Sequence, residues 1–172
     1  MLEKSIKEIT VKELVDEVDI NRSTFYLHYA DIYQMLQKIE EEALENITYM
    51  LTDSPVDFSD KESTLAFTTK FFSILDGDKD LCRALLGPHG DMAFVEQIEN
   101  LLASTFLKQP PGRFSKDDPD LKYAYAFTLN GCVGLIKVWL SQPVQESPAH
   151  MAELTCCLIE NTTQGYLNIL TK

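Results

Sequence analysis

A short stretch with two closely spaced helix-start signals, Ile9–Tyr29, most constrains how this chain can fold. Thr10 with a glutamate three residues later forms a T-x-x-E capping box, and apolar residues follow at helical spacing. Asp19 stands where this first helix must end, and aspartate tolerates a left-handed backbone better than most residues. Asn21 is a good N-cap for a second helix, Arg22–His28. The stretch therefore predicts two short helices joined by a tight turn.

The second of these helices has an apolar side and a polar side. Phe25 and Tyr29 are four residues apart and are predicted to face inward with Ile20, an apolar plug between the helices. Short polar groups and an arginine at a helix N-terminus suit base edges and phosphates in a DNA major groove. The same spacing fits a plain amphipathic helix pair with a solvated face, so both interpretations stay open. The residues predicted to face outward are Arg22, Ser23, Thr24, Tyr26 and His28.

Few turn signals interrupt the rest of the chain. Only 7 glycines occur among 172 residues, which favours long helices over many short strands. Met1–Glu8 is predicted to be the end of a helix followed by a short connection. The predicted fold class is all-α, with a helix-turn-helix head before a C-terminal helical bundle. The later helices, with caps at Asp31, Ser59, Asp91, Asp118 and Ser147, are predicted over about 32–51, 59–75, 79–86, 92–108, 118–140 and 147–170.

The last two predicted helices are apolar on more than one side and are joined by a short connection. Gly131 and Gly134 lie inside the first of them, where each glycine costs about 1 kcal/mol of helix propensity. Close approach of another helix is one way to offset that loss. Pairing with a second copy would form a four-helix bundle and a homodimer, although packing within the monomer also fits. The candidate interface residues are Gly131, Gly134, Leu135, Leu154, Leu158 and Tyr166.

Composition narrows the protein class. No stretch approaches the roughly 18 apolar residues of a membrane span, and the N-terminus lacks the apolar segment of a secretory signal. We therefore predict a cytoplasmic protein with no membrane partner. The four cysteines show neither C-x-x-C spacing nor paired histidines, so we predict no metal site and no cofactor. Cys156 and Cys157 are predicted to be buried free thiols, with a redox sensor as the alternative.

The charge of the chain is unfavourable for binding DNA, because phosphate contacts dominate affinity. The formal net charge is −12. The segment Lys4–Tyr29 is closer to neutral, with four basic and five acidic residues and a net charge of −1. The acidic excess lies later and includes the run Glu40–Glu42. An acidic body would repel DNA while the head docks, so the electrostatic signature of a nucleic-acid binder is weak.

The segment Ile9–Leu36, ITVKELVDEVDINRSTFYLHYADIYQML, resembles the TetR family of bacterial transcriptional regulators. The similar features are Thr-x-x-x-Leu in the first helix, the apolar turn residue, Ser-Thr-Phe-Tyr, and the aromatic-x-His-aromatic run. The later layout is also similar, and GCVGLIKVWL followed by SPAHMAEL looks like one branch of such C-terminal domains. The resemblance implies a helix-turn-helix DNA-binding domain over 1–46, incomplete at its N-terminus, and an effector-binding and dimerisation domain over 47–172.

The resemblance also implies roles for residues that match the family's motif. One group matches positions that contact phosphates before the turn, and a second matches the base-reading start of the recognition helix. A third matches the pair that anchors the DNA backbone. These groups are, in order, Thr10 and Lys12; Arg22, Ser23 and Thr24; and Tyr26 and His28.

The chain departs from the family pattern in three places. Asp19 stands where glycine is usual in the turn. Ala30 and Ile32 stand near the start of the family's fourth helix, where a basic residue is common, so at least one phosphate contact is predicted to be absent. Most of the family's first helix is missing, which would leave Val11 and Phe25 less covered. Either earlier residues precede this sequence, which we expect, or the head is loosely folded.

Together these features predict a dimeric DNA-binding regulator, a repressor that a small-molecule effector releases from its double-stranded DNA operator. The alternative is an interaction or ligand-binding protein of the same fold that does not bind DNA specifically, which the acidic charge favours. An enzyme is not predicted, because no nucleophile, base and orienting acid share a readable spacing. The candidate residues of the ligand pocket are Phe67, Phe71, His89, Phe94, Tyr123, Phe127 and Trp139.

Overall fold

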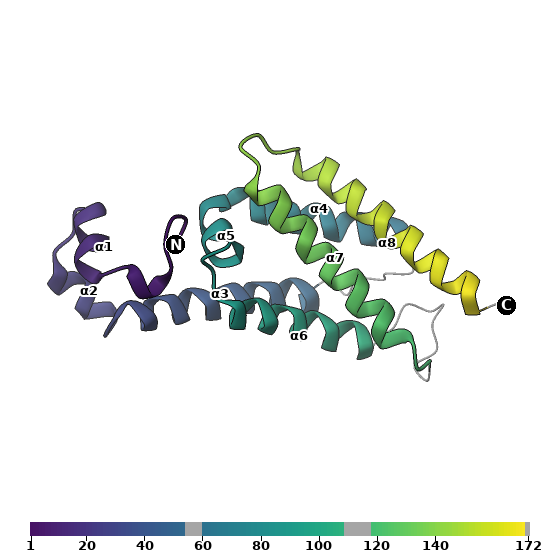
Figure 1. Ribbon diagram of the computed structural model, residues 1–172, viewed down its shortest axis with the longest axis horizontal. Coiled ribbons are helices and arrows are strands. Elements are labelled where there is room, and N and C mark those ends of the chain that lie inside the picture. The colour runs from purple at the N-terminus through teal and green to yellow at the C-terminus, as the bar shows by residue number, and fades with distance from the viewer. Residues whose placement is uncertain (54–59, 109–117, 171–172) are drawn as a thin grey trace.

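The computed structural model of the chain describes residues 1–53, 60–108 and 118–170. The elements in these ranges are all helical, which confirms the predicted all-α fold class. Figure 1 shows a small head at one end of an elongated molecule, joined by the long helix α3 to a bundle of further helices. In chain order the elements are a 3-10 turn (Ile6–Glu8), α1 (Val11–Glu17), α2 (Arg22–His28), α3 (Ile32–Asp53), α4 (Lys61–Gly77), α5 (Lys79–Leu86), α6 (Met92–Lys108), α7 (Leu121–Ser141) and α8 (Pro148–Leu170).

The N-terminal segment differs from the prediction of a helix end. Only Ile6–Glu8 is helical, as a single 3-10 turn. The Glu8 carboxylate accepts hydrogen bonds from both the backbone N–H and the hydroxyl of Ser5, each at 3.0 Å. The backbone N–H of Glu8 donates in return to the carbonyl oxygen of Ser5 at 3.0 Å, so the polar groups of this short turn are satisfied locally.

Two predicted helix starts are also shifted. α7 begins at Leu121, with Asp120 as its N-cap, so it starts later than a cap at Asp118 predicts. The Asp118 carboxylate stabilises the turn before the helix, where its Oδ1 accepts from the backbone N–H of Asp120 at 3.0 Å, and its Oδ2 accepts from the Tyr166 hydroxyl at 2.6 Å. For α4, the predicted cap Ser59 lies outside the described residues. The cap in the structure is Asp60, whose carboxylate accepts from the backbone N–H of residue 63 at 2.7 Å.

Two hydrophobic clusters form the core of the described residues. The first joins α4, α7 and α8, where Phe72 lies edge-on to Trp139 with ring centroids 5.3 Å apart. The second joins α3, α5 and α6 through Leu36, Leu85 and Phe94, and the N-terminal segment packs against it. Leu86 of α5 packs against both clusters, so α5 connects the helix that carries the head to the rest of the bundle.

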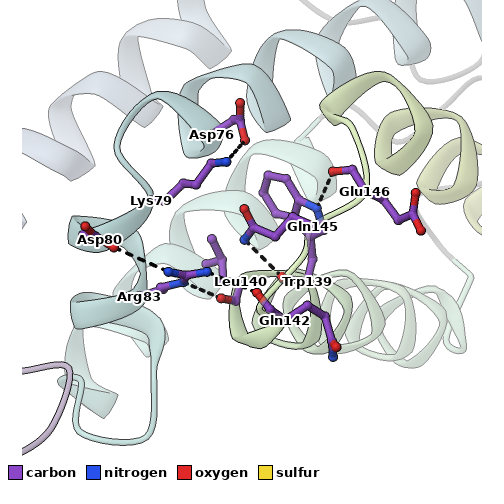
Figure 2. Close-up of polar contacts among 9 residues, drawn as sticks. All are labelled: Asp76, Lys79, Asp80, Arg83, Trp139, Leu140, Gln142, Gln145 and Glu146. Carbon is purple, nitrogen blue, oxygen red and sulfur yellow. Dashed lines mark hydrogen bonds and ion pairs between the residues drawn. The ribbon is translucent and has the colours of Figure 1, made fainter.

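Polar contacts fix the end of α7 against α5 (Figure 2). The Arg83 guanidinium donates from Nε to the carbonyl oxygen of Leu140 at 2.6 Å and from Nη2 to that of Gln142 at 3.2 Å. These carbonyls lie at the C-terminal end of a helix, where carbonyl groups lack intrahelical partners and a cation is favourable. The Trp139 indole donates to the carbonyl oxygen of Glu146 at 2.9 Å, which holds the connection to α8.

The most extensive contact between helices is that of α4 with α8. This contact gives the adjacent residues Cys156 and Cys157 different environments. Cys156 is buried there, with its sulfur 3.2 Å from the Thr68 hydroxyl, whereas Cys157 is exposed on the other side of α8. The prediction that both thiols are buried is therefore wrong for Cys157, because neighbouring residues of a helix point about 100° apart. Within the described ranges, no helix is long and apolar enough to span a membrane.

Candidate nucleic-acid interface

The start of α1 is fixed by the capping box that the sequence predicts. The backbone N–H of Thr10 donates to Glu13 Oε2 at 2.8 Å, and the backbone N–H of Glu13 donates to the Thr10 hydroxyl at 3.2 Å. Glu13 also forms an ion pair with Lys4, with Nζ 2.8 Å from Oε1. The hydrogen bond from Lys4, followed by those from Thr10, lowers the pKa of Glu13 to about 2. The same carboxylate thus caps α1 and holds the N-terminal segment against it.

The turn between α1 and α2 has the predicted left-handed residue. Asp19 has a φ of 52°, and the backbone N–H of Ile20 donates to the carbonyl oxygen of Val15 at 3.0 Å. Asn21 then caps α2 by accepting from the backbone N–H of residue 23 at 2.9 Å. The predicted role of Ile20 as an inward plug is wrong, because its side chain is 43% exposed. Val15 of α1 and Phe25 of α2 are the buried residues at this helix pair, so they provide its apolar contact themselves.

Helix α2 lies at one end of the molecule (Figure 1), and its polar side chains are exposed to solvent. Phe25 is only 3% exposed and anchors the helix, with its ring centroid 5.5 Å from those of both Tyr26 and Tyr29. The prediction that Arg22–His28 forms a solvent-facing helix is confirmed. All seven residues predicted to contact DNA are exposed: Thr10, Lys12, Arg22, Ser23, Thr24, Tyr26 and His28.

The cations of the head are only partly neutralised. The ion pairs in the part of the chain that the structure describes include Lys4 but involve neither Lys12 nor Arg22. A further cation, Lys38 of α3, was not identified from the sequence. Its Nζ lies 5.2 Å from the centroid of the Tyr29 ring and 3.5 Å from the carbonyl oxygen of His28. The signal available in the sequence is its position two helical turns after Asp31, on the same side of α3.

The arrangement of head and bundle has counterparts among known proteins. Residues 62–161, more than half of the chain, match the TetR family profile described as a transcriptional regulator C-terminal region. The chain belongs to the TetR family. The structure is similar to that of a TetR transcriptional regulator from Streptococcus agalactiae 2603V, with a TM-score of 0.58 and 20% identity over 92% of this chain and 85% of that chain. No curated protein matches the chain.

In this TetR-family chain a second exposed face lies on α7 and α8, and it is apolar. Phe127 is 71% exposed and Leu158 is 49% exposed. A Cβ atom added at Gly131 or Gly134 would meet nothing within 4 Å, so no other helix of the described monomer packs closely against them. Of the six predicted interface residues, the four exposed ones are Gly131, Gly134, Leu154 and Leu158. The other two have contacts inside the monomer, since Leu135 packs against the first cluster and Tyr166 donates to Asp118.

The structure separates the predicted pocket residues of this TetR-family chain into three groups. Phe67 and Phe71 stack with ring centroids 6.4 Å apart, and Phe71 and Trp139 belong to the first cluster. Phe94 is buried in the second cluster, whereas His89 is exposed between α5 and α6. Tyr123 and Phe127 are exposed on α7. The pocket remains a prediction; among its members, Phe71 stacks with Phe67 and shares the first cluster with Trp139.

Proposed function

We propose that this TetR-family protein binds an operator in double-stranded DNA through the polar face of α2. The observation that carries the proposal is a short, capped helix that buries Phe25 and leaves its arginine, hydroxyl and imidazole groups exposed. Arg22 stands in the first turn, where an arginine can read a guanine edge or hold a phosphate. Thr10 and Lys12 at the start of α1, with Tyr26 and His28 on α2, are then the candidate backbone contacts.

The proposed regulator is a homodimer through α7 and α8. The exposed apolar face and the uncovered glycines support this, because a second copy would bury the former and lie close to the latter. A dimer of this kind presents two recognition helices, which fit successive major grooves when they are about 34–36 Å apart. The division into a DNA-binding domain over 1–46 and a body over 47–172 falls inside α3, so one continuous helix would carry movements of the body to the head.

We further propose that the protein is a cytoplasmic repressor that a small-molecule effector releases from DNA. The effector must have different affinities for the two head spacings, since equal binding to both states shifts no equilibrium. The stacked rings of Phe67 and Phe71, beside the first cluster, support an aromatic-lined site in the bundle. Trp139 belongs to the same cluster, and Arg83 of α5 donates to the carbonyl oxygen of the neighbouring Leu140, so such a site would connect through α5 to α3.

Selection of genomic fragments with purified protein, followed by mobility-shift assays, tests the proposal. Arg22→Ala should lower the affinity for the selected operator by about 1–3 kcal/mol, the size expected for one good base contact. Lys70→Ala removes an equal charge from the exposed surface of α4 and is the matched control, for which operator affinity should change little. Operator-selective binding that persists unchanged in a dimeric Arg22→Ala variant would exclude α2 as the recognition helix.

The dependence on salt separates this function from that of an interaction protein with the same fold. Specific binding should weaken steeply as salt rises, since each phosphate contact releases condensed counterions. Binding that is weak, unselective and insensitive to salt would support the alternative, in which the acidic chain recognises a partner other than DNA.

A further inference from the structure

Gln34 and Lys38 of α3 contact the segment that leaves α2, and Asp31 precedes them at the start of the helix. The spacing of these three polar residues places them on one side of the helix. The Asp31 carboxylate accepts from the backbone N–H of Gln34 at 2.8 Å and so caps α3. The Gln34 side chain in turn accepts from the backbone N–H of Ala30 at 2.6 Å. One turn further along, Lys38 reaches the C-terminal end of α2 itself.

Lys38 makes two favourable contacts there. Its ammonium group lies 3.5 Å from the carbonyl oxygen of His28, at the end of a helix where the unpaired carbonyls carry partial negative charge. It also lies 5.2 Å from the centre of the Tyr29 ring, within the range of a cation–π interaction. The Tyr29 ring packs against Phe25, the buried anchor of α2. Lys38 therefore contacts the recognition helix through both its backbone end and its aromatic side.

A helix as short as α2 depends on such contacts. Arg22–His28 has only two turns, and isolated helices of this length are not stable in water. Its N-terminal end is fixed by the Asn21 cap. The contacts from Gln34 and Lys38 of α3 fix the C-terminal end of α2. That end is about 10 Å from the N-terminal end, for seven residues at the α-helical rise. Lys38 is thus at the opposite end of α2 from Arg22, so its position suits orienting the helix rather than reading bases.

We propose that Lys38 is a positioning residue that holds α2 at the angle needed for base readout. This role in readout rests on the proposed DNA-binding function, but the contact that carries it can be tested without DNA. Lys38 is exposed, so substitutions there leave the buried core unchanged.

The first experiment measures the contact by NMR in the full chain. The ε-methylene protons of Lys38 should be shifted upfield by the Tyr29 ring current. The shift should persist in Tyr29→Phe, which keeps an aromatic ring, and disappear in Tyr29→Leu. Lys38→Met should speed amide hydrogen exchange in the last turn of α2, and Lys38→Arg should restore the slower exchange. Random-coil shifts for these protons in the unsubstituted protein, or unchanged exchange in Lys38→Met, would overturn the proposal.

The second experiment measures binding to the selected operator and to unrelated DNA of the same length. Lys38→Met should weaken operator binding by about threefold to tenfold, the combined size of a cation at a helix end and an exposed cation–π contact. Lys38→Arg should bind like the unsubstituted protein. Lys122→Met is the matched control, because Lys122 lies 4.8 Å from the Tyr123 ring centroid on α7, away from the head. Its operator affinity should not change.

The slope of affinity against salt distinguishes positioning from direct contact with DNA. For a positioning residue, Lys38→Met leaves the slope and the binding of unrelated DNA unchanged while operator preference falls. If Lys38 instead holds a phosphate, the slope falls by about 0.9 and both DNAs are bound less tightly, which would overturn the proposal. If the unsubstituted protein selects no operator, the proposed DNA-binding function fails, and the NMR measurements still decide whether Lys38 holds α2.

Discussion

The two exposed faces of this TetR-family chain have opposite chemistry. The face of α2 presents side chains that form hydrogen bonds, such as Arg22 and Thr24, over a buried aromatic anchor. The face of α7 and α8 presents Phe127, Leu158 and uncovered glycines. A polar face can stay in water until a hydrated polyanion replaces that water, whereas a large apolar face gains stability only when another surface covers it. We therefore expect the first face to bind a partner reversibly and the second to form the proposed dimer.

The largest effect is expected from placing charges on the apolar face. Phe127→Arg combined with Leu158→Arg should convert the dimer to a monomer, because unpaired charges in a buried interface cost about 3–5 kcal/mol. Sedimentation analysis measures the change as a rise of at least about a hundredfold in the dissociation constant. Operator binding should fall with it, since one head contacts only half of the site.

Ile74→Arg is the control for this double variant. Ile74 is also an exposed apolar residue, but it lies on α4. Its substitution should leave the dimer intact. If the double variant sediments as a dimer like the control, the face on α7 and α8 is not the dimer interface. Its apolar character then has no role in assembling the protein.

A smaller effect, informative by its sign, is expected from Gly134→Ala. In the monomer the new methyl group meets nothing within 4 Å, so it should stabilise α7 by about 1 kcal/mol through helix propensity. In a dimer with closely approaching helices, the same methyl group should weaken association instead. Thermal unfolding at several protein concentrations separates the two. Gly77→Ala, also in open space at the end of α4, is expected to change no association constant. Tighter or unchanged dimerisation of Gly134→Ala would mean that no helix approaches this position closely.

The helices of the head were predictable from the sequence because the signals that set them are local. The box of Thr10 and Glu13, the left-handed Asp19 and the cap Asn21 each act within four residues, and all are present in the structure. The prediction that Ile20 is buried is wrong because the direction of its side chain depends on the backbone geometry of the turn, which the sequence does not specify. Val15 and Phe25 make the buried contact instead.

Tertiary contacts account for most of what the sequence did not reveal. Helical spacing indicates that Phe94 and Trp139 face inward, but not that they enter different clusters. Lys38 lies ten residues from His28 in the chain, and only the angle between α2 and α3 brings them together. Likewise, the apolar pattern of α8 includes both Cys156 and Cys157, and only the packing of α4 decides which of the two is buried.

The smallest effect is expected in the polar contacts of the head, where Glu13 links the N-terminal segment to α1. Its pKa is lowered from 4.5 to about 2, mainly by the hydrogen bond from Lys4. A lowered pKa means that the contact contributes stability above about pH 4.5 and loses it as the pH falls towards 2. Because both side chains are exposed, this contribution is small.

An NMR titration of the Glu13 carboxyl group tests this contact directly. Lys4→Met should raise the pKa of Glu13 towards its ordinary value, whereas Lys7→Met, in the same segment, should not. Some lowering should remain in Lys4→Met, because the two hydrogen bonds from Thr10 also favour the charged carboxylate. A Glu13 that titrates near 4.5 in the unsubstituted protein would show that the ion pair with Lys4 does not hold the N-terminal segment, and would leave the apolar contacts of Met1 and Ile6 with the second cluster to do so. The N-terminal segment would then depend on burial, as the α7–α8 face does, and the contrast between polar and apolar regions would not extend to it.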